Sequence, residues 1–208
     1  MADELVLYTN PMSRGRMARW MLEEVGQPYK AEILEYASMK SPDYLAINPM
    51  GKVPAVRHGD TIVTEAAAIC AYLAFPEAGL APSSGSRLRG PYYRWLFFGA
   101  GPIEAANTNK ALKLVVPAER TRMVGYGTQE EVLAALEDQL SRSEYIAGDR
   151  FTAADVYVGS HIGSGMMYGV VDKRPAFERY WSLVGSRPAA QRAREIDEEL
   201  AAAGRKAS

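Results

Sequence analysis

The chain has 208 residues, of which 48% are hydrophobic and 24% are charged, and its formal net charge is −1. This composition is typical of a globular protein and excludes an intrinsically disordered chain. The near-neutral charge argues against a nucleic-acid-binding protein or a polybasic membrane surface, and no run of about 18 apolar residues predicts a membrane-spanning helix. A single cysteine, Cys70, excludes a disulfide framework and a thiolate-rich metal site. Because the acidic start lacks the features of a secretory signal, the sequence predicts a cytoplasmic protein.

The first part of the chain alternates between strand and helix patterns. Strands are expected at residues 5–8, 30–34, 53–56 and 61–63, and helices at 13–25, 41–47 and 65–75. Gly26 stands where a left-handed residue would end the first helix, and Gly59-Asp60 is an accepted two-residue hairpin turn. The order βαβ, short helix, ββα predicts a parallel strand pair followed by an antiparallel hairpin.

The rest of the chain has a helical pattern. A Pro-, Gly- and Ser-rich stretch at 77–86 is typical of a linker. Helices are then expected at 91–114 and 128–143, and from Thr152, Pro175 and Pro188 onward. The sequence therefore predicts an α+β protein of two domains: a βαβ-ββα domain at 1–76 and an all-α domain at 87–208, joined by the linker at 77–86.

The common catalytic signatures are missing. The two histidines, His58 and His161, have no partner at the spacing of metal ligands, so structural roles are expected and no metal is predicted. The glycines at 163–165 lie inside a helical stretch with no strand before them, so close helix packing explains them better than dinucleotide binding.

Ser13 is the first candidate for chemistry. It lies in the loop Asn10-Pro11-Met12-Ser13, which joins the first strand to the first helix. A hydroxyl there sits near the positive end of the helix dipole, where an anion is stabilised without a charged side chain. The alternative is that Ser13 only caps the helix.

Two further segments suit a peptide-like ligand. If the Val53–Pro54 bond is cis, the N–H and C=O of Val53 are free to pair with a ligand backbone; the alternative is a rigid turn. Glu65 can bind a cation and the N–H of Ala66 a carboxylate, so together they suit the zwitterionic end of an α-amino acid. A glutamate at a helix start is also a good partner for the helix dipole, which requires no ligand.

In this order, these elements resemble the glutathione transferase superfamily, and the resemblance covers essentially the whole chain. It implies a thioredoxin-like glutathione-binding domain, a helical domain and a homodimer. It also implies a detoxifying conjugation of glutathione, as co-substrate, to a small hydrophobic electrophile. The segments that carry it are NPMSRGRMARWMLEE (10–24), SPDYLAINPMGKVPAV (41–56), TEAAAICAYL (64–73) and GDRFTAADV (148–156).

The resemblance also implies roles for single residues. Ser13 matches the serine of theta- and phi-like classes, which donates a hydrogen bond to the glutathione sulfur. Val53 before Pro54 matches the backbone clamp on the cysteinyl residue. The other matches are Glu65 for the γ-glutamyl end, Lys40 and Lys52 around the glycine carboxylate, and Thr152 with Asp155 for a capping box that acts in folding.

Two positions depart from the family pattern. Ala66 stands where the family usually has serine or threonine, so one hydroxyl contact is lost, and we expect glutathione binding to be weaker by roughly 1–3 kcal/mol at most. Met39 stands where a histidine often precedes the lysine. Neither change removes the element that activates the sulfur.

The sequence leaves several alternatives open. Tyr8 could donate to the sulfur, but its place in an apolar run favours a buried strand residue, and Arg14 could assist Ser13 electrostatically. An isomerase, a dehalogenase or a disulfide reductase could use the same thiolate. The other alternative is a non-catalytic glutathione- or ligand-binding protein, against which Ser13 argues and for which Ala66 argues mildly. Neither nucleic acid nor a membrane is expected as a partner.

Overall fold

The computed structural model describes residues 4–207, which form two compact units. The first holds the chain up to Ala78 together with the segment from Arg187 on, and the second spans Gly79–Ser186. The first unit contains β1 (Leu5–Thr9), α1 (Gly15–Val25), β2 (Tyr29–Ile33), η1 (Ser38–Lys40), α2 (Pro42–Leu45), β3 (Ala55–His58), β4 (Thr61–Thr64), α3 (Ala66–Leu73), η2 (Pro76–Ala78) and α9 (Pro188–Ala207). The second contains α4 (Arg89–Phe98), η3 (Gly99–Ile103), α5 (Glu104–Ala111), η4 (Ala118–Met123), α6 (Gln129–Arg142), α7 (Ala153–Met167) and α8 (Pro175–Val184).

The first unit is built on a mixed sheet with the strand order β2-β1-β3-β4. β1 runs parallel to β2 and antiparallel to β3, and β3 and β4 form the expected hairpin across Gly59-Asp60. β1 is buried because it lies inside the sheet, which explains why its sequence is continuously apolar. The thioredoxin-like βαβ-ββα architecture expected from the sequence is confirmed.

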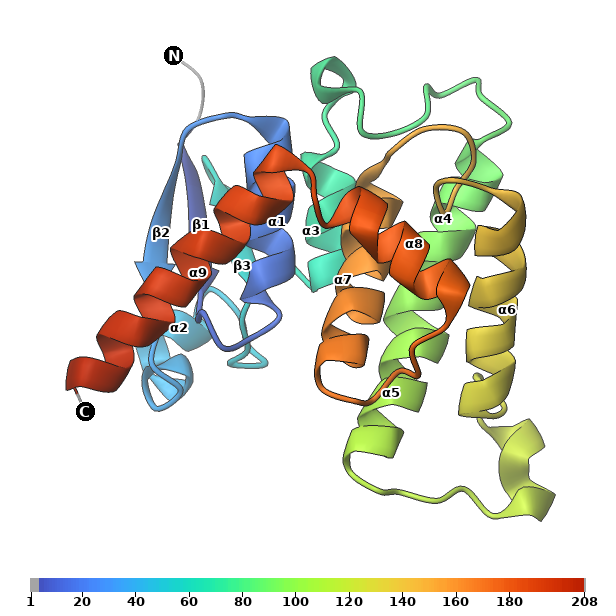
Figure 1. Cartoon of the computed structure of the whole chain (residues 1–208). Helices are drawn as coiled ribbons and strands as arrows, with labels where there is room; N and C mark the ends of the chain where they lie inside the picture. The colour runs from blue at the N-terminus through green and yellow to red at the C-terminus, as the bar shows by residue number, and fades with distance from the viewer. Residues whose placement is uncertain (1–3, 208) are drawn as a thin grey trace. The chain divides into compact units, whose positions relative to one another are not determined.

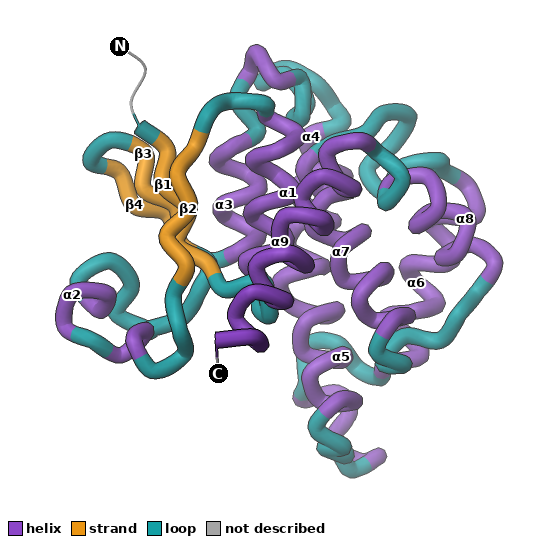
Figure 2. Tube along the Cα trace, turned by 60° about the vertical axis from the view of Figure 1, so that its left-hand side comes forward, coloured by secondary structure: helices purple, strands orange, loops and turns teal. Residues whose placement is uncertain are grey.

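Helices α1, α3 and α9 lie on one side of this sheet (Figure 2). α1 is buried on most of its circumference because it packs against both α3 and α9. It ends at Gly26, which has a φ of 72° and donates its N–H to the carbonyl of Leu22. Glycine takes this left-handed conformation without the penalty that a side chain brings.

Helix α9 gives the first unit its last layer and crosses α1 in Figure 1. Its buried residues follow a helical spacing: Ala190, Ala193, Asp197 and Ala201. The expected division at 77–86 grouped this helix with the all-α domain, whereas its contacts place it with the thioredoxin-like unit. The stripe is made of alanines and one aspartate, and its helical spacing predicts a face that packs but not the unit against which it packs.

The second unit is helical, as expected. The helix expected at 91–114 is divided, because the π-turn η3 separates α4 from α5. Pro102 lies in this turn and has no N–H to donate, which breaks the regular α-helical ladder. The glycines of α7 serve close packing: a Cβ on Gly163 would lie 2.7 Å from the Trp181 ring, and one on Gly165 would lie 2.4 Å from Val171.

The start of α7 contains the expected capping box. Asp155 is fully buried, and its Oδ2 accepts hydrogen bonds from the backbone N–H and the hydroxyl of Thr152. Its Oδ1 accepts from the N–H of Ile146 and the hydroxyl of Tyr180. One carboxylate thus ties together the helix start, the preceding loop and α8. Within residues 4–207, none of the helices has the length and apolar character needed to cross a membrane.

Candidate functional site

The strand registers bring three predicted segments to one end of the sheet. Tyr8, near the end of β1, pairs with Ala55 at the start of β3, and Ala55 pairs with Thr64 at the end of β4. The loop after β1, the turn before β3 and the start of α3 therefore leave the sheet at the same end. This end holds the residues around Ser13, Val53 and Glu65.

The loop after β1 is held by the side chain of Asn10. Its Nδ2 donates to the carbonyl of Leu34 at 2.9 Å, and its Oδ1 accepts from the N–H of Met12 at 2.9 Å. Asn10 is almost fully buried, so these bonds lie inside the protein. The backbone that leads to Ser13 is therefore fixed by its own side-chain contacts.

Ser13 is half-buried and lies two residues before α1. Its hydroxyl donates to the carbonyl of Asn10 at 2.7 Å and accepts from the N–H of Gly15, the first residue of the helix, at 2.9 Å. Ser13 therefore satisfies one of the free amides at the helix start. The adjacent Arg14 is exposed.

Gly15 allows this loop to lie close to the end of β1. A Cβ on Gly15 would lie 1.9 Å from Thr9 Oγ1 and 3.1 Å from Ser13 Oγ. The Thr9 hydroxyl is fully buried and has no hydrogen-bond partner among the described residues. There is no room for a side chain at this position.

We expect Gly15→Ala to lower the free energy of unfolding by about 1–3 kcal/mol, because Thr9 and the loop would have to move. Urea denaturation measures this loss. Gly90→Ala in α4 is the matched control, since a Cβ there meets no heavy atom within 4 Å. That change should be neutral or stabilise by up to about 1 kcal/mol, and equal losses in the two variants would contradict the close approach.

Tyr8 is half-buried rather than buried, and its hydroxyl is engaged on the neighbouring strand. Arg57 Nε donates to it at 3.4 Å, and its ring packs against that of Tyr44 with centroids 5.9 Å apart. The apolar run of β1 therefore ends with a phenol held at the sheet surface.

The turn before β3 contains a cis Val53–Pro54 bond, as considered from the sequence. Tyr44 Oη and Asn48 Nδ2 both donate to the carbonyl of Lys52, at 2.7 and 2.8 Å, and fix the residue before Val53. Among the described residues, nothing forms a hydrogen bond with the Val53 N–H or C=O. The backbone of Val53 is thus held in place with its polar groups available.

Lys40 lies along the same turn. Its Nζ donates to the carbonyl of Met50 at 2.7 Å, and its side chain packs where Gly51, with a φ of 57°, leaves space. An ammonium group has three donors, so two remain for a ligand. Lys52 is exposed, whereas Met39 is buried.

Glu65 stands at the start of α3 with a φ of 65° and a ψ of 119°. A non-glycine residue in this region costs on the order of 1–3 kcal/mol, and such strain is often found at functional sites. Its side chain is exposed and has no hydrogen-bond or ion-pair partner in the described part of the chain. Ala66, the first residue of α3, is buried.

Three residues that hold the site were not singled out from the sequence: Asn10, Tyr44 and Asn48. Burial, helped by the nearby Tyr8, raises the pKa of Tyr44 to about 12, so its phenol is a neutral donor. The two asparagines share one signal, the tripeptide Asn-Pro-Met, which occurs at 10–12 and 48–50. In both, the Asn side chain accepts the N–H of the residue two positions later, as in an Asx-turn.

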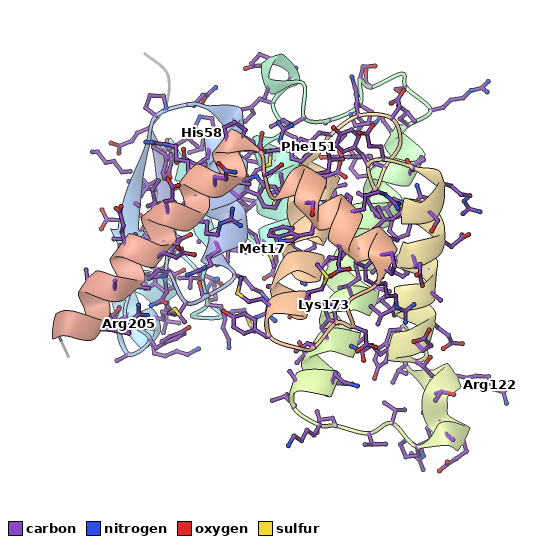
Figure 3. All side chains as sticks on the ribbon, in the orientation of Figure 1. Met17, His58, Arg122, Phe151, Lys173 and Arg205 are labelled. Atoms are coloured by element: carbon purple, nitrogen blue, oxygen red, sulfur yellow. The ribbon has the colours of Figure 1, made fainter. Side chains whose placement is uncertain are left out.

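The remaining nucleophilic and metal-binding residue types lie elsewhere. Cys70 is fully buried, and burial raises the pKa of its thiol to about 12, so this thiol is protonated at neutral pH. His58 lies at the opposite end of β3 (Figure 3), with its Nδ1 2.9 Å from Tyr72 Oη. His161 is buried in the second unit, with its ring edge-on to Tyr157. Within residues 4–207, no group of three or more metal-ligating side chains is found.

Comparisons with known proteins identify the family of this chain. The family model described as "Glutathione S-transferase, N-terminal domain" matches residues 3–75, and "Glutathione S-transferase, C-terminal domain" matches 117–164. The chain is 27% identical to a probable glutathione S-transferase of rice, over 83% of this chain and 86% of that protein. It is also 27% identical to the disulfide-bond oxidoreductase YghU of Escherichia coli K12, over 93% of this chain and 75% of that protein.

A solved structure resembles most of the chain. The structure of a sphingomonad glutathione S-transferase complexed with glutathione matches it with a TM-score of 0.75 and 29% identity. The match covers 93% of this chain and 98% of that one. The two family models together span the sheet end described above and part of the helical unit. The chain therefore belongs to the glutathione transferase superfamily, as a glutathione S-transferase.

Proposed function

We propose that this enzyme joins the glutathione thiolate to a small hydrophobic electrophile, with Ser13 as the hydrogen-bond donor to the sulfur. The sulfur forms a bond to the electrophilic carbon, and the leaving group departs with its electron pair. The thiol proton is lost to solvent when the tripeptide binds. The observation that carries the proposal is the convergence of Ser13, the free Val53 backbone and the strained Glu65 at one end of the sheet.

One hydroxyl and one helix N-terminus can supply the free energy needed to stabilise the glutathione thiolate. A free thiol has a pKa of about 8.5, and lowering it by about 2 units requires roughly 2.7 kcal/mol of preferential thiolate stabilisation. A hydrogen bond to a charged group supplies about 1.5–3 kcal/mol, and a helix N-terminus about 0.3–1 kcal/mol more. The thiol pKa can therefore be lowered without a general base. This fits the sequence, in which both histidines lie far from the Ser13 loop.

The contacts of Ser13 support its use as a donor. Without a ligand the Ser13 hydroxyl donates its hydrogen bond to the carbonyl of Asn10. Rotation about the Cβ–Oγ bond of Ser13 lets the same hydroxyl donate to a sulfur instead. The Asn10 carbonyl still accepts the backbone N–H of Ser13 at 3.1 Å, so the rotation does not leave it unpaired. Throughout, the N–H of Gly15 donates to the Ser13 oxygen, which polarises the O–H bond.

The rest of the tripeptide fits the other segments. The N–H and C=O of Val53 pair with the cysteinyl residue, while the Glu65 carboxylate binds the amino group of the γ-glutamyl end. The N–H of Ala66 faces the adjoining carboxylate, and Lys40 and Lys52 bind the glycine carboxylate. The exposed Arg14 adds positive charge beside the sulfur site. We also propose a cytoplasmic homodimer, and sedimentation at several concentrations tests this assembly.

A disulfide reductase is the second candidate, because the Escherichia coli relative bears that name. In this reaction the glutathione thiolate attacks a disulfide and releases one thiolate, and a second glutathione resolves the mixed disulfide. The buried Cys70 takes no part, so both thiols would come from glutathione.

Calorimetry and two assays test these proposals together. Glutathione titrated into the protein should bind with micromolar to millimolar affinity, and the absence of binding would overturn both candidates. Turnover of an activated aryl halide with glutathione supports the transferase, whereas turnover of a small disulfide without conjugation supports the reductase. Binding without either turnover would indicate a ligand-binding protein.

The Ala66 position offers a gain-of-binding test. We expect Ala66→Ser to lower the KM for glutathione by about fivefold, because the new hydroxyl adds a bond worth about 1 kcal/mol to the γ-glutamyl carboxylate. Ala68→Ser is the matched control, since it adds the same hydroxyl to an exposed position of α3. An unchanged KM in Ala66→Ser would show that Ala66 does not face the ligand.

A further inference from the structure

Thr9, the last residue of β1, carries a buried hydroxyl group. Its side chain alternates with that of Tyr8 and therefore lies on the same face of β1 as Leu5 and Leu7, which are buried and apolar. The Thr9 carbonyl accepts the N–H of Leu34 at 2.8 Å, whereas Thr9 Oγ1 has no hydrogen-bond partner among residues 4–207. The main chain of Thr9 is thus satisfied and its side chain is not.

Folding stability does not account for a threonine at this position. Burying a hydroxyl without a partner costs free energy, because the group loses its hydrogen bonds to water. Valine has nearly the same shape as threonine and also favours a strand, and it brings no such cost. An unpaired buried hydroxyl therefore calls for an explanation other than packing.

The Thr9 hydroxyl lies beside the hydroxyl of Ser13. Both oxygens border the space that a Cβ on Gly15 would fill: Thr9 Oγ1 is 1.9 Å from that point, and Ser13 Oγ is 3.1 Å from it. Because two sides of a triangle limit the length of the third, the two oxygens are no more than 5.0 Å apart. An O–H···O bond spans about 2.7–2.8 Å, so a movement of about 2 Å at most would join them. The missing side chain of Gly15 keeps the space between them open.

The contacts of Ser13 leave its oxygen able to accept one more donor. A hydroxyl oxygen has two lone pairs, and the N–H of Gly15 occupies one of them at 2.9 Å. The hydroxyl itself donates to the carbonyl of Asn10 at 2.7 Å. When it rotates to donate to a sulfur, a lone pair takes the direction that the proton has left and faces the Asn10 oxygen, which repels it. A donor that reaches this lone pair therefore stabilises the rotated hydroxyl.

We propose that Thr9 is a positioning residue for Ser13: once the Ser13 proton has turned to the glutathione sulfur, the Thr9 hydroxyl donates to the Ser13 oxygen. The inference rests on the function proposed above, because it requires Ser13 to serve the sulfur. Thr9 gains its partner only in this state, so the new hydrogen bond stabilises the ligand-bound arrangement relative to the free one. Two donors on one oxygen also polarise its O–H bond more than one donor does, which strengthens the bond to the thiolate.

Two variants separate the hydroxyl of Thr9 from its shape. Thr9→Val removes the hydroxyl and keeps the volume, so we expect a melting temperature equal to or above that of the wild type. The pKa of the bound glutathione thiol, measured by the ultraviolet absorbance of the thiolate, should rise by about 0.5–1 unit. At a pH of about 5.5, below the thiol pKa, kcat should then be about three- to tenfold lower.

The conservative variant should show the opposite pattern. Thr9→Ser keeps the hydroxyl but loses a buried methyl group, so it should melt at a lower temperature and yet titrate within about 0.2 unit of the wild type. Thr61→Val is the matched control, because it makes the same change at the exposed start of β4. It should leave the titration and kcat unchanged.

A double-mutant cycle shows whether Thr9 acts through Ser13. In a Ser13→Ala background the accepting oxygen is gone, so Thr9→Val should no longer change the thiol pKa. An equal change with and without Ser13 would overturn the proposal. A Thr9→Ser variant as impaired as Thr9→Val would also overturn it, since the shape of the side chain would then be the cause.

The wild-type titration distinguishes this proposal from the proposed function. A wild-type protein that binds no glutathione would overturn the proposed function, and the role of Thr9 with it. A lowered thiol pKa in the wild type that Thr9→Val leaves unchanged would overturn the role of Thr9 alone. If Thr9→Val does not fold, Thr9→Ala, which also lacks the hydroxyl, is compared with Thr9→Ser in its place.

Discussion

Replacing Ser13 by alanine is expected to lower kcat/KM for conjugation by roughly 10- to 150-fold, the loss of one hydrogen bond to a thiolate. The pKa of the bound glutathione thiol should rise toward its free value of about 8.5, so the pH–rate profile of the variant should shift to higher pH. Stopped-flow turnover and the absorbance of the bound thiolate measure the two effects. Ser13→Thr, which keeps a hydroxyl, should retain part of the activity.

Two comparisons separate catalysis from folding. The Ser13 hydroxyl also accepts a hydrogen bond from the N–H of Gly15, so Ser13→Ala should lower the free energy of unfolding by about 1 kcal/mol. The assays should therefore be run well below the melting temperature of this variant. Tyr8→Phe removes the competing hydroxyl, which is held by Arg57, and should leave turnover near that of the wild type. The opposite pattern, an inactive Tyr8→Phe and an active Ser13→Ala, would show that Tyr8, and not Ser13, donates the hydrogen bond to the glutathione sulfur.

Asp155→Ala should lower the free energy of unfolding by about 3–5 kcal/mol. The four donors that Asp155 satisfies come from Ile146, Thr152 and Tyr180, and each would be left buried without a partner. Urea denaturation measures the loss. The control is the second capping box of the chain, at the start of α6, where Glu131 accepts from Thr128 but both residues are exposed. Glu131→Ala should cost about 1 kcal/mol, and similar costs at both sites would contradict the role of burial.

The same carboxylate predicts a pH dependence. Burial raises the pKa of Asp155 from 3.8 to about 6, although its four hydrogen bonds act in the other direction. A carboxyl group whose pKa is raised on folding stabilises the fold most below its unfolded pKa, and this contribution is lost as the pH rises through the folded value. The stability of the wild type relative to Asp155→Asn should therefore fall by about 2 kcal/mol between pH 4 and pH 7. A constant difference over that range would show that Asp155 titrates normally.

The sequence predicted the parts of the site that depend on local chain geometry. A proline at a strand start and a capping box each leave a local signal, and the resemblance placed Ser13, Val53 and Glu65 in one order, whereas the two Asn-Pro-Met tripeptides were not recognised. The packing of Tyr44 against Tyr8 depends on how distant segments meet, which no local pattern records. The place of α9 was missed for a related reason, since an amphipathic pattern predicts a buried face but not the unit against which that face packs.

The first unit is assembled from two pieces of chain that the entire second unit separates. A ribosome makes the chain from one end, so the segment that ends at Ala78 emerges long before its final layer. During this interval Arg19 and Glu24 have no access to Asp197 and Arg187, and the face of α1 that α9 later covers is open to water or to chaperones. The helical unit is continuous in sequence and is not delayed in this way. Synthesis thus favours an order in which the glutathione-binding unit is the last to be completed, although it is the first to be translated.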